Sequence, residues 1–169
     1  MTRLPSSRRS PGASVPVRIQ EQDFDLATEY TNLRTRHPTP GAVVSFIGLV
    51  RDMDAYGAVQ ELYLEHYPGM TERALHDIVA MAGTRWSLTD TYVIHRIGKL
   101  LPAEQIVMVM TAAPHRSDAF AACEFIIDFL KTEAPLWKRE QTTQGTQWIE
   151  TRDMDLQRTQ RWESPGEKT

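Results

Sequence analysis

Cysteine is almost missing from this sequence. Cys123 is the only one among 169 residues, so no disulfide can form within a single chain. It falls on the apolar side of an expected helix, which favours a buried, inert thiol over a nucleophile. The cysteine makes no CxxC pair, and the five histidines include no HxxxH or HExxH pair. These absences disfavour a zinc site, and we expect no metal and no bound cofactor.

Long apolar runs and a strong charge of one sign are also lacking. No stretch approaches the roughly 18 apolar residues of a membrane-spanning helix. Arg8 and Arg9 lie near the start, but serine and proline follow them where a signal peptide needs an apolar segment. The net charge of −3 disfavours a general nucleic-acid-binding protein, which would carry a broad basic surface. We therefore expect a cytoplasmic protein that acts neither on nucleic acid nor in a membrane.

The size and composition that are present suit one globular domain. The chain has 169 residues, of which 41% are hydrophobic. We expect a disordered leader over residues 1–14, which are rich in proline, serine and arginine, and a flexible tail over residues 163–169. The domain between them, residues 15–162, contains no internal repeat and no linker. Its expected elements follow the order βαββαββαβ, which indicates an α+β fold.

The stretch at residues 115–140, HRSDAFAACEFIIDFLKTEAPLWKRE, organises the rest of the chain. Most of it predicts an amphipathic helix, because apolar residues recur on one face: Ala119, Phe120, Cys123, Ile126, Ile127 and Leu130. Ser117 and Asp118 suit the first turn of this helix. Pro135 predicts that the helix ends within residues 131–134, because the residue before a proline disfavours helical geometry.

Several strands are predicted outside this stretch. Residues 42–50, AVVSFIGLV, are apolar except for Ser45, which favours a strand buried on both faces. Residues 52–57 are polar and predict a hairpin loop, and residues 141–145 predict another loop. The other expected strands cover 15–19, 59–67, 91–97, 105–113 and 147–150.

Five basic residues fall at the ends of expected elements, where side chains from distant parts of the chain can converge: Arg51, Arg116, Lys131, Lys138 and Arg152. Arginine makes paired hydrogen bonds to phosphate, and a lysine crowded by other cations gives up its proton more readily. The alternative is that these residues are ordinary solvated surface charges. Spacing alone favours solvated surface charges, whereas the arrangement of these residues also suits a basic pocket for a phosphorylated, anionic substrate.

Two other side chains, those of His115 and Phe46, allow two interpretations each. His115 could act as a general acid or base or donate to a phosphate, and a structural role is equally compatible with its position. Phe46 fits the core of a strand, although a ring next to Arg51 could also stack on a heterocycle. His95 lies within a strand and favours a structural role. Physical reasoning alone therefore reaches an α+β domain with an anion-binding pocket.

Four segments together resemble the family of large, catalytic subunits of molybdopterin synthase. They are GAVVSFIGLVRD at 41–52, LEHYPGMTE at 64–72, VIHRIG at 93–98, and HRSDAF with DFLKTEAPLWKRE within 115–140. The similarity extends over residues 15–162. It implies an α/β-hammerhead fold with an additional antiparallel β subdomain.

The same resemblance implies an enzyme of molybdenum cofactor biosynthesis that is a sulfurtransferase. Such a subunit forms a homodimer, and each protomer binds a small ubiquitin-like sulfur-carrier subunit, which gives a heterotetramer. The carrier ends in a Gly-Gly tail with a terminal thiocarboxylate. Two sulfur transfers from this tail to cyclic pyranopterin monophosphate would generate the dithiolene of molybdopterin.

The resemblance also assigns the site. Lys131 and Lys138 match the catalytic lysines of the family. The substrate-binding positions match Phe46, Arg51, His115, Arg116 and Arg152, of which the last is expected to reach the neighbouring protomer's site. The loop over residues 52–57 departs from the asparagine-containing loop that is common in relatives.

Two other functions are compatible with a basic pocket. One is a non-catalytic module that binds the carrier or a phosphate ligand, although the presence of both lysines argues against it. The other is a phosphate-ester enzyme of unrelated mechanism, which would turn over substrate without any carrier protein.

Overall fold

The computed structural model of the chain describes residues 16–36, 40–54, 57–149 and 153–162. The expected leader, the expected tail and Arg152 lie outside these ranges. Within them the chain forms four helices and nine strands. In chain order these are β1 Val17–Gln20, α1 Leu26–Arg36, β2 Ala42–Leu49, β3 Met53–Asp54, β4 Gly57–His66, α2 Met70–Arg85, β5 Asp90–Arg96, β6 Gly98–Leu100, β7 Gln105–Ala113, α3 Arg116–Glu133, β8 Leu136–Thr142, β9 Gly145–Ile149 and α4 Asp153–Gln160.

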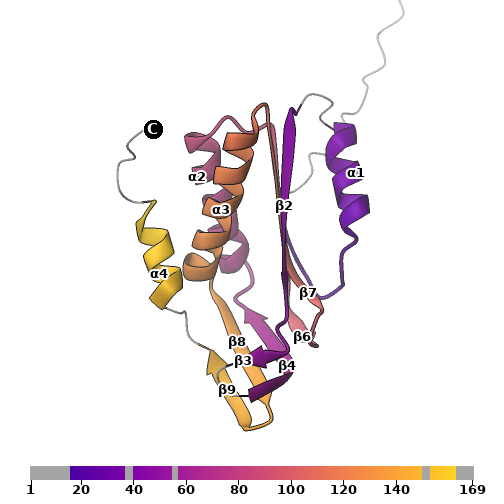
Figure 1. Cartoon of the computed structure of the whole chain (residues 1–169), viewed down its shortest axis with the longest axis vertical. Helices are drawn as coiled ribbons and strands as arrows, with labels where there is room; N and C mark the ends of the chain where they lie inside the picture. The colour runs from indigo at the N-terminus through magenta and orange to yellow at the C-terminus, as the bar shows by residue number, and fades with distance from the viewer. Residues whose placement is uncertain (1–15, 37–39, 55–56, 150–152, 163–169) are drawn as a thin grey trace, which may run out of the picture.

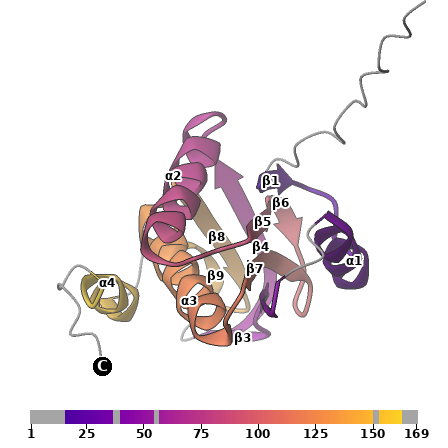
Figure 2. The same cartoon turned by 90° about the horizontal axis from the view of Figure 1, so that it is seen from above.

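The main sheet has the strand order β1-β5-β7-β2, in which β1 is parallel to β5 and the other pairs are antiparallel. Helices α2 and α3 cover one face of this sheet and α1 lies on the other (Figure 1, Figure 2). A second, antiparallel sheet has the order β3-β4-β8-β9, with β6 also paired to β4. The α+β prediction is therefore confirmed, and the second sheet agrees with the antiparallel subdomain that the family resemblance implied.

Helix α3 buries more of its surface than one apolar stripe. Phe125 is fully buried against the rings of Trp86 and Trp162, with ring centroids 5.3 Å and 5.5 Å away. Because α3 packs against α2 as well as against the sheet, its buried surface also includes Phe125 and Phe129. The prediction that Phe120 belongs to the core is wrong, since 63% of that side chain is exposed.

Strand β2 is also less buried than predicted. It occupies an edge of the main sheet and pairs only with β7 among the described strands. Leu49 is 53% exposed and Phe46 is 38% exposed. The prediction of a strand buried on both faces is wrong, because a largely apolar sequence does not tell whether the neighbour that covers it belongs to the same chain.

Strand β8 was not predicted at all. Its sequence, LWKREQT, shows neither an apolar run nor a regular alternation. The strand forms because β4 pairs with it on one side and β9 on the other. Since β8 continues to Thr142 and β9 starts at Gly145, most of the expected loop over 141–145 belongs to these two strands.

The first residues of β2 lie close to the corner that leads into α3. A Cβ atom on Gly41 would lie only 2.1 Å from the carbonyl oxygen of Pro114, so this position needs glycine. Pro114 directly precedes His115, the N-cap of α3. Gly41 thereby allows the close approach that fixes where α3 begins.

We predict that Gly41→Ala lowers the free energy of unfolding by about 1–3 kcal/mol, because the added methyl group meets rigid backbone. Gly83→Ala is the matched control, since apart from the backbone of α2 itself and the adjacent residues nothing lies within 4 Å of its Cβ position. That substitution is expected to raise the stability by up to about 1 kcal/mol, as alanine favours a helix. Urea denaturation measures both changes, and a Gly41→Ala variant as stable as the natural protein would contradict the close approach.

Candidate functional site

The two predicted catalytic lysines lie on either side of the junction between α3 and β8. Lys131 is in the last turn of α3, and its Nζ lies 3.5 Å from Oδ1 of Asp155 in α4. Lys138 is in β8, opposite Leu64 of β4 and Ile149 of β9. A helix end and a strand thus bring the two lysines to the same end of the molecule.

A buried histidine lies near Lys138. The ring of His95 is 2% exposed, and its Nδ1 is 2.8 Å from the carbonyl oxygen of Arg96. Burial lowers the pKa of His95 to about 4; its contact with the Arg96 backbone opposes this shift, and the nearby Lys138 and His66 add to it. His95 is therefore a neutral, buried group near Lys138, as expected for a structural histidine.

Arg51 lies at the lysine end of the molecule. Strand β7 leads into α3 and is antiparallel to β2, so α3 and β2 run towards the same end of the sheet. Arg51 is exposed and follows β2 by two residues. Phe46 is on the face of β2 that also carries Val44, a residue packed in the same cluster as α3. The positions of Arg51 and Phe46 are thus compatible with a site near the lysines.

His115 and Arg116 lie at the opposite end of α3. His115 is the N-cap and Arg116 the first helical residue, and both side chains are exposed. Together with Ser117 and Phe120 they line a shallow hollow of about 370 Å³. At 1.5 Å per residue, the 15 residues from Arg116 to Lys131 correspond to about 22 Å along the helix. One chain alone therefore does not assemble all the predicted cations around one substrate.

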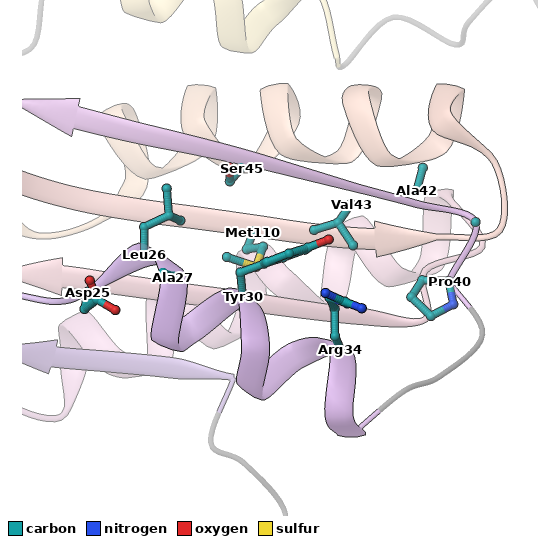
Figure 3. A pocket seen from close by; sticks show the side chains of 11 residues that line it. Asp25, Leu26, Ala27, Tyr30, Arg34, Pro40, Ala42, Val43, Ser45 and Met110 are labelled. Carbon is teal, nitrogen blue, oxygen red and sulfur yellow. The ribbon is translucent and has the colours of Figure 1, made fainter.

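A larger groove lies on the other face of the main sheet (Figure 3). It has a volume of about 950 Å³ between α1 and β2, and Tyr30, Arg34, Val43 and Met110 are among its lining residues. None of the predicted site residues that the structure describes lines it. We therefore do not place the site there, in spite of its size.

Cys123 is buried on α3, and burial raises the pKa of its thiol to about 11. This agrees with the predicted inert thiol. Among the described helices, none combines the length and the apolar character needed to cross a bilayer.

One partner of the site was missed by sequence reasoning. Asp155 gives no local signal, since it is one of two acidic residues in the first turn of a short polar helix. Only the docking of α4 on α3 reveals that it faces Lys131. A carboxylate next to the predicted catalytic amine is thus a product of tertiary packing.

Comparison with known proteins identifies the family. The family model described as "MoaE protein" matches residues 19–133. The molybdopterin synthase catalytic subunit of Ralstonia nicotianae is 56% identical over 146 residues, which cover 86% of this chain and 83% of the relative. The chain belongs to the MoaE family. Another member, the molybdopterin synthase catalytic subunit of Vibrio cholerae, is 53% identical over 87% of this chain and 97% of its own length.

The fold of a MoaE protein has also been determined experimentally. The solved structure of the molybdopterin biosynthesis MoaE protein from Burkholderia ambifaria superposes with a TM-score of 0.75. It is 52% identical in sequence, and the match covers 87% of this chain and 97% of that one. The resemblance read from the four sequence segments is thereby confirmed.

We predict that the stability of the protein falls as the pH drops from about 6.5 to about 4. His95 has an ordinary pKa of 6.5 when unfolded and about 4 when buried, so the unfolded chain binds more protons in this range. The contribution of neutral His95 to the free energy of unfolding is fully present above pH 6.5. By pH 4 its loss amounts to about 2–3 kcal/mol.

Urea denaturation at a series of pH values measures this dependence. His95→Asn keeps a donor for the Arg96 carbonyl but does not titrate, so its stability is expected to vary less between pH 6.5 and 4. His76→Gln, on α2, is the control and should keep the full slope. If His95→Asn kept the same slope as the natural protein, the assignment to His95 would be wrong.

Proposed function

We propose that this MoaE protein is the catalytic subunit of a molybdopterin synthase. It would transfer sulfur from the terminal thiocarboxylate of a small ubiquitin-like carrier subunit to cyclic pyranopterin monophosphate. The observation that carries the proposal is the position of Lys131 and Lys138 at one end of α3, with Arg51 following the strand that runs to the same end. Close relatives named molybdopterin synthase catalytic subunit support the same conclusion.

The chemistry of sulfur transfer explains why ammonium groups are useful there. The thiocarboxylate sulfur attacks a carbon of the pterin side chain, and an oxygen leaves that carbon with a proton. An ammonium group can supply that proton. Water then cleaves the acyl–sulfur bond, and a cation stabilises the negative oxygen of the tetrahedral intermediate. The carrier leaves with an ordinary carboxylate, and a second carrier repeats the sequence to complete the dithiolene.

We assign the roles as follows. Lys131 acts as the general acid or base, or as a nucleophile, and Lys138 holds the substrate electrostatically. Arg51 contributes paired hydrogen bonds to the substrate phosphate. Phe46 packs against the heterocycle. His115 and Arg116 also bind the phosphate, beside the N-terminus of α3, but they need a second protomer to reach the lysines.

The exposed edge of β2 supports a homodimer. The eight residues of β2 contain no charged side chain and no proline, the features that usually prevent an edge strand from pairing with another chain. A second copy of the chain is the simplest partner, because two identical edges can pair antiparallel about a two-fold axis.

This pairing would complete the site. Strand β2 starts near His115 and Arg116 and ends near the lysine end of α3. A two-fold axis near the middle of β2 would lay the start of one strand beside the end of the other. The strand spans about 23 Å at 3.3 Å per residue, which is close to the 22 Å or so between Arg116 and Lys131 along α3. His115 and Arg116 of one protomer would then face the lysines of the other.

We predict that Lys131→Ala slows single-turnover conversion of the precursor by at least about 100-fold, because it removes the proton donor. Lys138→Ala should weaken precursor binding and slow conversion as well. Lys99→Ala is the control, since Lys99 is an exposed lysine of β6 paired with Glu61. The reaction mixture contains thiocarboxylated carrier and precursor, and the dithiolene pterin is measured by fluorescence after oxidation.

The same assay separates the alternatives. Unchanged conversion by Lys131→Ala would exclude the assigned role. A natural protein that binds the carrier without conversion would be a binding module. Turnover of the phosphorylated substrate without carrier would indicate a phosphate-ester enzyme.

We predict that two inactive variants restore activity when they form mixed dimers. If the site uses Lys131 of one protomer and Arg116 of the other, a dimer of Lys131→Ala with Arg116→Ala contains one intact site and one doubly altered site. Mixed dimers purified with two different tags should regain about half of the natural activity. Mixing Lys131→Ala with Lys138→Ala, two variants of the same half-site, is the control and should restore none. If the first pair also stayed inactive, the site would not be shared between protomers in this way.

A further inference from the structure

Helix α4 brings a carboxylate to one of the two lysines. Oδ1 of Asp155 lies 3.5 Å from Nζ of Lys131. The Asp155 side chain is only 20% exposed, whereas that of Lys131 is 40% exposed. The carboxylate is thus the better fixed partner of the two. Since Lys131 belongs to α3 and Asp155 to α4, this ion pair depends on how α4 docks.

The docking of α4 does not rely on the Asp155 side chain. Asp128 of α3 is 2% exposed, and its Oδ2 accepts hydrogen bonds of 2.8 Å from Nη2 of Arg161 and Nε1 of Trp162. The hydroxyl groups of Thr132 and Thr159 lie 3.1 Å apart and also join α3 to α4. A buried carboxylate that loses its partners costs several kcal/mol, so this anchor is strong. Asp155 is thereby presented to Lys131 by a rigid support.

A lysine side chain has four rotatable bonds and samples many positions when it is free. A carboxylate within about 4 Å attracts the ammonium group and restricts the positions that it samples. Catalysis by a general acid requires that the acid already lies within reach of the leaving oxygen, because ordering it at the moment of reaction slows the step. A fixed anionic partner on a neighbouring helix meets this requirement.

We propose that Asp155 is a positioning residue for Lys131: it holds the ammonium group in the site, ready to act as the acid. The catalytic consequence rests on the proposed sulfur-transfer function, whereas the contact itself does not. Because α4 is anchored by buried groups of α3, Asp155 stays paired with the Lys131 amine, and the substrate does not have to displace it.

The first test is kinetic. Asp155→Asn keeps the size of the side chain but removes its charge, and it is expected to lower kcat about 5- to 20-fold while KM for precursor and carrier changes less than about 2-fold. Asp155→Glu keeps the charge and should retain at least about half of the activity. Asp153→Asn removes the other acidic charge from the first turn of α4, where the side chain is exposed, and should leave kcat unchanged. The thermal midpoint should be the same in all four proteins.

Three kinetic outcomes would overturn the proposal. They are a natural kcat in Asp155→Asn, an equal loss of kcat in Asp153→Asn, and a loss confined to KM. A fall in the thermal midpoint of Asp155→Asn that accounts for the lost activity would also overturn it, because the role of Asp155 would then be structural.

The second test needs no turnover. The acetylation rate of Lys131 by N-hydroxysuccinimidyl acetate, measured by peptide mass spectrometry, should rise about 3-fold in Asp155→Asn, because the amine is no longer held against a carboxylate and reaches the reagent more easily. The rate at Lys99, which pairs with Glu61, should not change. An unchanged rate at Lys131 would refute the positioning role. A raised labelling rate in a protein without sulfur transfer would instead refute the proposed function and leave the contact established.

Discussion

The packing of α3 between the main sheet, α2 and α4 is the constraint on which the rest of this structure depends. Phe125 and Ile126 are fully buried on it, and Asp128 is buried among partners from the C-terminal segment. The helix cannot shift or bend without opening this core. Its length therefore sets a fixed separation between the cations at its start and those at its end. A site that needs both groups has to recruit a second chain.

The second sheet complements this arrangement. Strand β8 carries Lys138, and strands on both of its sides hold it in register. The chain therefore leaves a rigid helix and enters a central strand within a few residues, with Pro135 at the junction. Two lysines that are close in sequence are held by two different kinds of secondary structure, so each can be positioned independently of the other.

Much of this fold could be predicted from the sequence, because its main elements have strong local patterns. The predicted end of the central helix within 131–134 agrees with α3 ending at Glu133, and the strands expected over 91–97 and 105–113 correspond to β5 and β7. What local patterns cannot give is pairing across the chain. Strand β8, the edge position of β2 and the contact of Asp155 with Lys131 all depend on neighbours far away in sequence.

The separation of the predicted cations is a different case. Residues 116 and 131 both belong to the helix that the sequence predicts, and a helix of that length keeps its ends about 22 Å apart. The two ends of one such helix therefore cannot converge, even where the ends of different elements do. The family resemblance supplied the predicted site residues, and the rise of a helix per residue explains why one chain does not bring all of them together.

The uncharged edge of β2 also has a consequence for handling the protein. An apolar strand without a lysine, glutamate or proline is the kind of segment that seeds ordered aggregation when it stays open. Dilution, or a substitution that weakens self-association, would produce monomers in which the edge of β2 is unpaired. The amount of protein lost to aggregates should then follow the fraction of monomer. Concentrated stocks should therefore stay in solution longer than dilute ones.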